Sequence, residues 1–417
     1  MTAEFTHRNN QFYCEDVPVD SLADEYDTPL YVYSQNHFQN RIENFKDALS
    51  SVDHEICYAV KCNGNLSVLN RMAEIGSGFD IVSGGELRRV LEAGGDPSQV
   101  VFAGVGKTRA EQEMALDAGI LMFNVESVPE MQQLSKVAGE MGTTADIALR
   151  VNPDVDAKTH DKISTGKKEN KFGLPIALID DYVDEAASLP NISLEGLHFH
   201  IGSQITTIEP FEKMIDKASS LVDRLREEGH DISTLNLGGG IGIRYRDEQP
   251  LTPYDWADAV LPEIEKRDLR LIVEPGRFLM GNAGVLVTQV EYVKESVTKN
   301  FVVVDGGMND LIRPAMYDAY HEIVPLNPRN ADHITADVVG PICESSDYFG
   351  KDRELPEPQP GDYLAIKSAG AYGFAMASQY NAFPRPAEIL VDENSHTVVR
   401  EPEDYSDLWA GEKNPRT

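Results

Sequence analysis

The stretch Glu55-Ile56-Cys57-Tyr58-Ala59-Val60-Lys61-Cys62-Asn63 is a short apolar run that ends in a lysine. A run of this kind is typical of a buried strand, and it delivers the Lys61 amine to a place where solvation is poor. Poor solvation lowers the pKa of a lysine and leaves the free base that attacks carbonyl groups. The alternative is a lysine whose stem packs on the strand end while its ammonium reaches water. The rest of the chain has to decide between the two.

Apolar runs of strand length recur down the chain, with helix-length segments between them. The eight runs are Ile56–Lys61, Phe79–Ser83, Val100–Val105, Leu121–Val125, Ile147–Asn152, Leu197–Ser203, Leu235–Gly240 and Leu271–Arg277. This alternation predicts an α/β fold with a (β/α)8 TIM-type barrel, whose active site lies at the C-terminal ends of the strands. The chemically suggestive residues fall at those ends, namely Lys61, Arg150, His200, Gly238 to Gly240, Glu274 and Arg277.

The pattern changes after Gly281, which predicts a second domain. Shorter β-type runs broken by Pro and Gly follow, and they indicate an all-β domain. These runs are Val285–Val293, Phe301–Asp305, Thr335–Val339, Tyr363–Lys367, Glu388–Val391 and Thr397–Val399. The strand-like segment Pro29–Tyr33 precedes the barrel and is expected to join this β domain. We therefore expect an N-terminal segment at 1–34, a barrel at 35–280 and a β domain at 281–417.

One long polar stretch, residues 152–173, interrupts the barrel pattern. It holds five lysines and too little apolar content for a helix of its own. A loop of this length inside an enzyme barrel is commonly a lid. We expect a mobile active-site loop here.

The composition is strongly acidic, with 69 Asp and Glu against 37 Lys and Arg and a formal net charge of −32. Such a charge argues against nucleic acid or an anionic membrane as a partner. It suggests a protein adapted to high salt, because a Debye length of about 3 Å at molar salt removes most of the self-repulsion; the alternative is an ordinary acidic enzyme. The four cysteines lack zinc or disulfide spacing, and we see no signal peptide or transmembrane run, so we expect a cytoplasmic protein.

Two motifs allow competing interpretations. The glycine run Gly238–Gly240 suits a backbone that closes on phosphate oxygens, and the rival is a dinucleotide-binding fingerprint. That rival fails because Ile243 stands where the third glycine belongs. His198 and His200 point to the same face of one strand, so a metal-binding pair of an amidohydrolase-like barrel is the alternative to a cofactor-contacting histidine.

Seven motifs, taken together and in order, resemble the fold-type III pyridoxal-phosphate amino-acid decarboxylases, and among them most closely the members that act on diaminopimelate. The resemblance spans nearly the whole chain. The motifs are Tyr58-Ala59-Val60-Lys61-Cys62-Asn63, His198-Phe199-His200-Ile201-Gly202-Ser203-Gln204, Gly238-Gly239-Gly240, Glu274-Pro275-Gly276-Arg277, Asp305 to Pro314, Gly340-Pro341-Ile342-Cys343-Glu344-Ser345-Ser346-Asp347 and Gly370-Ala371-Tyr372-Gly373. The resemblance implies an alanine-racemase-like barrel with a C-terminal β domain.

The resemblance also implies pyridoxal 5′-phosphate as cofactor and assigns its contacts. Lys61 would hold the cofactor aldehyde, and Glu274 would keep the pyridine nitrogen protonated through a charge-assisted hydrogen bond. His200 would stack on the ring, whereas His198 would be a satisfied barrel histidine. The remaining cofactor contacts implied are Ser203, Gly239, Gly240, Pro275, Gly276, Arg277 and Tyr372, with Asp80 and Arg150 orienting polar groups near the lysine. No metal site is expected.

For the substrate, the resemblance implies a diamino dicarboxylic acid that loses carbon dioxide at its D-centre to give L-lysine. Cys343 would return a proton to the carbon, and Glu344 would bind the distal amino group. The distal carboxylate would be bound by Arg277, Arg313 and Tyr317, with Tyr372 touching both phosphate and substrate. Cys343 and Glu344 would enter the active site of the other subunit, so a homodimer with shared sites is implied.

Three rival functions stay open from the sequence. An ornithine, arginine or carboxynorspermidine decarboxylase would carry the same cofactor motifs, but an arginine pair for a carboxylate is wasted on a substrate that ends in an amine. A metal hydrolase would use the histidine pair. A noncatalytic relative would be expected to lack Lys61 or Cys343, and both are present.

Overall fold

A computed structural model describes residues 5–156 and 171–414, and the chain divides into two compact units. The first comprises residues 1–40, 244–247 and 279–417, here called the β unit; the second comprises residues 41–243 and 248–278, here called the barrel unit. The sequence-based domain limits near residues 34 and 281 lie close to these divisions, and we keep them as a proposal for the functional domains. Most of the predicted loop at 152–173 lies outside the described residues.

The barrel unit contains a closed ring of eight parallel strands in the described part of the chain. They pair in the order β9-β11-β12-β13-β5-β6-β7-β8, and β8 returns to β9. The strands are β5 (His54–Ala59), β6 (Gly78–Ile81), β7 (Val100–Phe102), β8 (Met122–Val125), β9 (Ala145–Asn152), β11 (Ile192–Phe199), β12 (Thr234–Asn236) and β13 (Arg270–Val273). A short β10 (Leu174–Pro175) adds to β9. The predicted barrel is confirmed.

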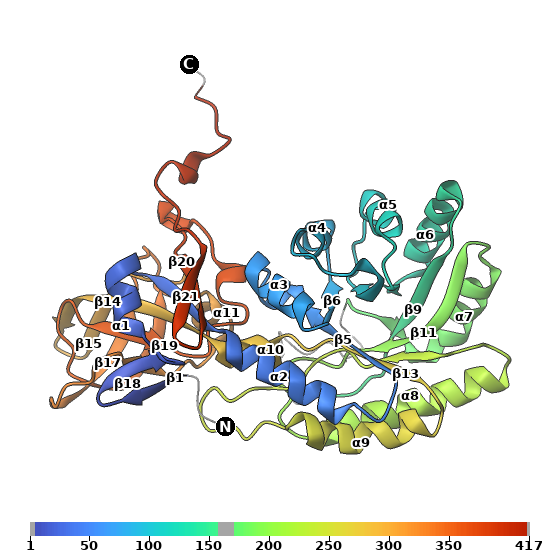
Figure 1. Ribbon diagram of the computed structural model, residues 1–417, viewed down its shortest axis with the longest axis horizontal. Coiled ribbons are helices and arrows are strands. Elements are labelled where there is room, and N and C mark those ends of the chain that lie inside the picture. The colour runs from blue at the N-terminus through green and yellow to red at the C-terminus, as the bar shows by residue number, and fades with distance from the viewer. Residues whose placement is uncertain (1–4, 157–170, 415–417) are drawn as a thin grey trace. The chain divides into compact units, whose positions relative to one another are not determined.

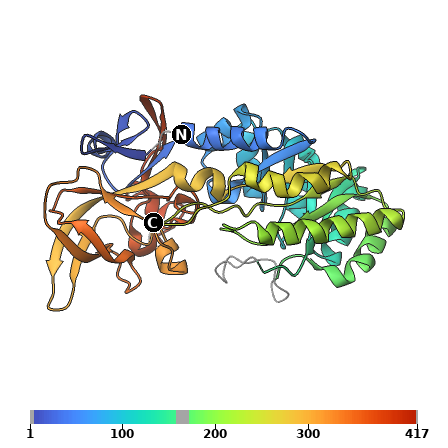
Figure 2. The same cartoon turned by 90° about the horizontal axis from the view of Figure 1, so that it is seen from below.

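Helices cover the outside of this ring, as Figure 1 shows. They are α2 (Gln35–Ala48), α3 (Leu66–Glu74), α4 (Gly84–Glu92), α5 (Arg109–Ala118), α6 (Val128–Met141), α7 (Ile179–Ser188), α8 (Glu209–Glu227) and α9 (Pro253–Glu265). Helix α5 begins with a capping box in which Thr108 and Glu111 exchange hydrogen bonds, and α9 begins with an equivalent box. Helices α8 and α9 run side by side (Figure 2).

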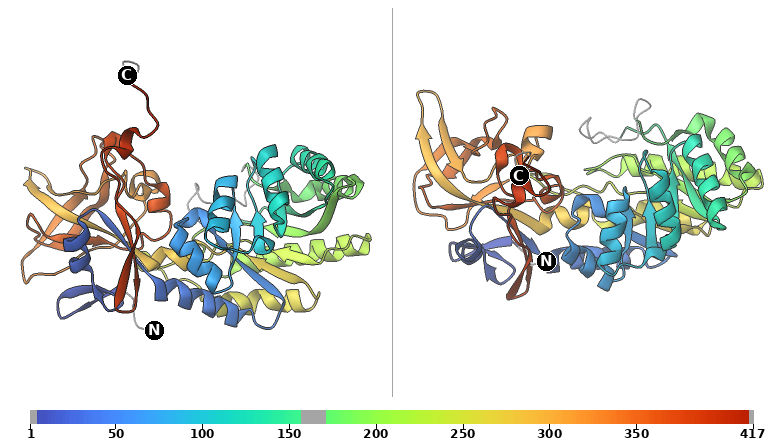
Figure 3. Two further views of the ribbon diagram at one scale, coloured as in Figure 1. Left: turned by 45° about the horizontal axis from the view of Figure 1, so that its top comes forward. Right: turned by 90° about the horizontal axis from the view of Figure 1, so that it is seen from above.

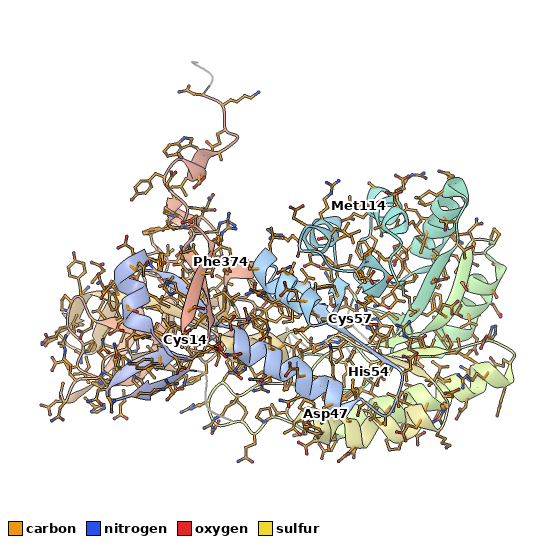
Figure 4. The ribbon with its side chains drawn as sticks, in the orientation of Figure 1. Cys14, Asp47, His54, Cys57, Met114 and Phe374 are labelled. Atoms are coloured by element: carbon orange, nitrogen blue, oxygen red, sulfur yellow. The ribbon has the colours of Figure 1, made fainter. Side chains whose placement is uncertain are left out.

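Inside the ring, small and medium side chains fill the space. Cys57, Val101, Met122, Ala148 and Ile272 form a buried cluster contributed by five different strands. Such inward-pointing layers make a barrel a packed core rather than a pore. Figure 4 marks Cys57 on β5. Polar chemistry is therefore left to the strand ends and their loops.

The β unit is built on a sheet in the order β18-β17-β15-β14-β4-β20-β21, with β19 pairing β14 and β16. Its strands are β4 (Leu30–Ser34), β14 (Gly284–Glu295), β15 (Asn300–Val304), β16 (Ile323–Pro325), β17 (His333–Val339), β18 (Tyr348–Pro356), β19 (Tyr363–Ile366), β20 (Ala387–Asp392) and β21 (Ser395–Arg400). The β20–β21 hairpin is drawn in red in Figure 3. A small sheet of β1 (Phe5–Arg8), β2 (Gln11–Cys14) and β3 (Val17–Pro18) precedes α1 (Val19–Tyr26).

The N-terminal strand β4 lies in the middle of this sheet. It pairs antiparallel with β14 and parallel with β20, and all five of its residues are buried. Leu30 and Val32 share a core with Val285 and Ile389 from those two neighbours. Residues from both ends of the chain therefore build one unit.

Among the described residues, no helix is both long and apolar enough to cross a bilayer. The four cysteines are free, and Cys14, Cys57 and Cys62 are buried whereas Cys343 is exposed. Within the same residues, no group of three or more His, Cys, Asp or Glu side chains could hold a metal ion.

Candidate active site

Lys61 does not lie in the strand itself. β5 ends at Ala59, and a 3-10 turn (η1, Val60–Cys62) carries Lys61 beyond the strand end. Its side chain is 39% exposed, so the expectation of a poorly solvated lysine was wrong for the chain alone. The reason is that Ala59 already closes the ladder, with its N–H bound to the Pro275 carbonyl at 3.2 Å. The amine therefore reaches into the open end of the barrel.

The amine of Lys61 contacts the carboxylate of Asp80, which follows from the pairing of Ala59 with Asp80 on adjacent strands. Asp80 is fully buried, and its Oδ1 atom has no hydrogen-bond partner. Burial and the Glu274 charge raise the pKa of Asp80, Lys61 opposes both, and the net result is a pKa of about 7. A buried carboxylate and the half-exposed amine thus form an ion pair at the end of the barrel.

Glu274 follows β13 directly and is buried. Its Oε1 atom accepts hydrogen bonds from the Asn124 amide at 3.0 Å and the Asn236 amide at 2.7 Å, and its Oε2 atom lies 3.4 Å from His198 Nε2. Burial alone would raise the pKa of Glu274, but His198, Lys61 and the Asn236 hydrogen bond lower it below its ordinary value. Glu274 is therefore held as an anion inside the barrel.

The glycine run after β12 forms a tight cradle. A Cβ on Gly239 would lie 2.3 Å from the Glu274 carbonyl oxygen, and one on Gly240 would lie 2.8 Å from the Gly202 carbonyl oxygen. Gly240 also has a φ of +123°, which side chains rarely adopt. Asn236 Oδ1 accepts from the Gly238 N–H at 2.9 Å, which ties the cradle to the Glu274 network.

His200 and Ser203 lie beside this cradle. The Gly239 N–H points at His200 Nδ1 at 3.3 Å, and Arg277 Nε donates to Ser203 Oγ at 3.1 Å. Burial, together with the positive charges of Arg150 and Lys61, lowers the pKa of His200 to about 3. The imidazole is thus neutral at physiological pH.

Arg150, on β9, is placed by Glu126. Its Nη1 donates to Glu126 Oε1 at 2.8 Å, and its guanidinium lies 4.9 Å from the centre of the Phe172 ring. Glu126 also accepts the N–H of Gly173 at 3.0 Å, where the chain returns from residues 157–170. The sequence offered no signal for Glu126, because a carboxylate after a strand resembles any surface residue.

In the β unit, Cys343 and Glu344 are exposed. Both residues are hydrogen-bonded to the 3-10 turn Tyr380–Ala382. The Cys343 N–H donates to Asn381 Oδ1 at 2.8 Å, and the Tyr380 hydroxyl donates to Glu344 Oε1 at 3.0 Å. The buried Asp347 also stabilises the segment 341–347, because its carboxylate accepts a hydrogen bond from the Ile342 N–H at 2.7 Å. The exposed Cys343 thiol therefore lies on a loop that hydrogen bonds hold in place.

Two further predicted residues lie on helix α11 (Arg313–Tyr317) of the same unit. Arg313 is buried, whereas Tyr317 is half-buried. The third, Tyr372, is half-buried with a φ of +57°. The structure thus brings Lys61, Asp80, His200, Ser203, Glu274 and Arg277 together with the glycine cradle in the barrel unit, and it places Arg313, Tyr317, Cys343, Glu344 and Tyr372 in the β unit.

Comparison with known proteins decides the family. Residues 35–281 match the family described as pyridoxal-dependent decarboxylase, pyridoxal binding domain. A diaminopimelate decarboxylase of Vibrio cholerae is 53% identical over 403 residues, which cover 96% of this chain and 96% of that protein. The chain belongs to the diaminopimelate decarboxylase family.

Solved structures of diaminopimelate decarboxylases have the same fold as this chain. The diaminopimelate decarboxylase of Helicobacter pylori complexed with L-lysine has a TM-score of 0.91 and 42% identity, over 94% of this chain and 98% of that one. The diaminopimelate decarboxylase of M. jannaschii in co-complex with L-lysine has a TM-score of 0.95 and 38% identity, and the match covers 100% of this chain and 99% of that one. The fold-type III architecture of the diaminopimelate decarboxylases is thus that of this chain.

The cofactor of the family is pyridoxal 5′-phosphate, and the barrel unit fits it. A cradle that any Cβ would fill suits the phosphate, because backbone N–H groups can then approach its oxygens. The unsatisfied Oδ1 of Asp80 and the anionic Glu274 suit a polar, cationic heterocycle. The motifs did not reveal Asn124 and Asn236, the two amides that hold Glu274.

Proposed function

We propose that this protein decarboxylates meso-2,6-diaminopimelate at its D-centre and releases L-lysine and carbon dioxide. Relatives of near-equal length carry the name diaminopimelate decarboxylase at up to 53% identity, and two solved relatives hold L-lysine. The observation that carries the proposal is Glu274, an anion kept inside a barrel beside Lys61. A buried anion is costly unless a cationic partner uses it.

When bound, pyridoxal phosphate supplies an electron-withdrawing ring that takes up the electron pair left by carbon dioxide. Glu274 would accept a hydrogen bond from the protonated pyridine nitrogen and keep that proton in place. Lys61 Nζ would hold the cofactor through its aldehyde, and the Asp80 carboxylate contacts this amine. His200 would lie against the cofactor ring. The residues that would bind the phosphate are Ser203, Gly239, Gly240, Gly276, Arg277 and Tyr372.

The β unit supplies the groups that act on the substrate. Cys343 Sγ gives a proton to the carbon from which the carboxylate has left. Glu344 binds the distal ammonium, and Arg313 with Arg277 and Tyr317 binds the distal carboxylate, since guanidinium groups bind carboxylates through two hydrogen bonds. Pro275 and Arg150 support the rim as positioning residues.

The protein acts, in this proposal, as a cytoplasmic homodimer. Cys343 and Glu344 are exposed on the single chain, which suits a segment that enters the active site of the partner subunit. The acidic surface suits a salt-rich cytoplasm and offers nothing to nucleic acid or to a membrane.

The test is incubation of the purified holoenzyme, in high potassium chloride, with meso-diaminopimelate, L-ornithine or L-arginine. We expect carbon dioxide and L-lysine from diaminopimelate alone. Release from ornithine or arginine, with none from diaminopimelate, would assign the chain to the other decarboxylases of this fold.

A further inference from the structure

Two of the groups in contact with Arg313 are the rings of Tyr245 and His321, which carry no negative charge. Its guanidinium carbon lies 4.8 Å from the centre of the Tyr245 ring, and its Nη1 atom lies 2.9 Å from His321 Nε2. Tyr245 and His321 also contact each other edge to face, with ring centres 5.4 Å apart. These two partners fix the direction of the guanidinium without neutralising it.

The hydrogen bonds of His321 define its tautomer. Its Nδ1 atom lies 2.8 Å from the carbonyl oxygen of Lys367, which can only accept, so Nδ1 carries the proton. Arg313 can only donate, so Nε2 must offer a lone pair. Only the neutral imidazole protonated on Nδ1 satisfies both contacts.

The strand ladder fixes the carbonyl that selects this tautomer. Strands β16 and β19 pair antiparallel with Ile323 opposite Ile366, and the ladder continues with the Lys367 N–H bound to the Glu322 carbonyl at 2.8 Å. The Lys367 ammonium also pairs with the Glu322 carboxylate at 2.8 Å. His321 is fully buried and is separated from β16 only by Glu322, so it has little freedom to turn.

We propose that His321 is a positioning residue that aims Arg313 at the distal carboxylate of the substrate. The Lys367 carbonyl orients His321, and the His321 lone pair orients the guanidinium. The inference rests on the proposed function, since it needs Arg313 to bind that carboxylate. It adds a residue that touches neither cofactor nor substrate.

Two substitutions separate the roles of the ring nitrogens. His321→Gln places an amide oxygen near the position of Nε2 and keeps the acceptor for Arg313. His321→Asn places its amide near Nδ1 and removes that acceptor. We expect KM for meso-diaminopimelate to rise at least about tenfold in His321→Asn, or about 1.4 kcal/mol, and less than about threefold in His321→Gln. The kcat of both should stay within about twofold.

Inhibition by L-lysine and by cadaverine distinguishes a specific loss of carboxylate binding from a general loss of structure, because a general loss would weaken both inhibitors. L-lysine retains the distal carboxylate, and cadaverine is the same diamine without it. In His321→Asn the inhibition constant of L-lysine should rise about as much as KM, and that of cadaverine should stay unchanged. His396→Asn is the matched control, because His396 bonds Tyr26 in the same unit, and it should change neither.

Equal behaviour of the Asn and Gln variants, or equal weakening of L-lysine and cadaverine, would overturn the inference. A wild-type holoenzyme that releases no carbon dioxide from diaminopimelate would instead overturn the proposed function. If the His321→Asn variant does not fold, the tautomer of His321 in the wild-type protein tests the proposal instead. Nitrogen NMR of 15N-histidine-labelled holoenzyme, with His321→Gln assigning the signal, should show the proton on Nδ1; a proton on Nε2 would contradict the proposal.

Discussion

Two buried carboxylates near one lysine have opposite acidities. Burial raises the pKa of Asp80 to about 7, whereas His198, Lys61 and Asn236 overcome burial at Glu274 and lower its pKa. Similar groups thus acquire different charges because their neighbours differ. At neutral pH, Glu274 carries a negative charge, and Asp80 lies close to its own pKa.

The raised pKa of Asp80 predicts a pH-dependent stability. Between about pH 4 and pH 7 the folded protein holds a proton on Asp80 that the unfolded chain has lost, so this residue contributes less stability as pH rises. Asp80→Asn cannot titrate. Its free energy of unfolding relative to the wild type should therefore increase by at least about 1 kcal/mol from about pH 5 to about pH 8.

Denaturant unfolding of the cofactor-free protein in high salt measures this difference. Asp117→Asn on α5 is the control, because Asp117 is exposed. A relative stability of Asp80→Asn that is independent of pH would show that burial does not perturb this carboxyl group.

Glu274→Gln tests the fixed charge. The substitution keeps the size of the side chain and the acceptor for the Asn124 and Asn236 amides but removes the anion. We expect kcat to fall at least about a hundredfold, as for other groups that hold a proton in place, with little change in thermal stability. Steady-state kinetics with meso-diaminopimelate measure it, and a kcat close to that of the wild type would mean that the ring nitrogen does not need Glu274.

Among the structural elements, the turn after β12 is tightly constrained. Its glycines lie so close to the Glu274 and Gly202 carbonyl oxygens that no side chain fits. Because these glycines have no Cβ, a phosphate can approach the backbone of this turn closely. The turn therefore serves packing and binding together.

Gly239→Ala should weaken cofactor binding. The added methyl group must displace the Glu274 carbonyl, and the cradle has to open. We expect the Kd for pyridoxal phosphate to rise at least about tenfold, which corresponds to about 1.4 kcal/mol. Titration of the cofactor-free protein by absorbance measures it. Gly142→Ala is the control, since its φ is +70° but nothing lies within 4 Å of the added Cβ; equal Kd values for the two variants would contradict the assignment.

The sequence predicts the barrel well because each strand is a separate apolar run. It predicts the strand ends less well. Lys61 was expected on a strand and lies in a turn, because closure of the ring, rather than the local pattern, decides where each ladder stops. Asn124 lies 150 residues from Glu274 along the chain, and His321 looks like any buried histidine, so neither could be recognised without the fold.

At the scale of the whole molecule, the charge of −32 predicts salt dependence. Self-repulsion destabilises the folded state in dilute buffer and is largely screened at molar salt, where the Debye length is about 3 Å. We expect the melting temperature and activity to rise with potassium chloride. Sucrose, which strengthens burial without screening charge, should not replace the salt. Full activity and stability in low salt would refute this prediction.

The proposed sharing of active sites between two subunits predicts complementation between inactive subunits. Lys61→Ala and Cys343→Ala should each be inactive alone. If Cys343 serves the active site of the partner subunit, a mixed dimer regains one intact site, so an equal mixture of exchanging subunits should recover up to about a quarter of the activity. Mixing, dissociation and reassociation followed by a carbon dioxide assay measures this. No recovery, with mixed dimers demonstrated, would place the cysteine and lysine of one site on the same chain.

Strand β4 has a consequence for synthesis of the protein on the ribosome. It joins the sheet between β14 and β20, and Leu30 pairs with Ala387 near the other terminus. A nascent chain exposes this apolar strand long before it supplies the second neighbour, β20. The barrel can assemble in the interval, whereas the edge of β4 stays uncovered and open to chaperones or to aggregation.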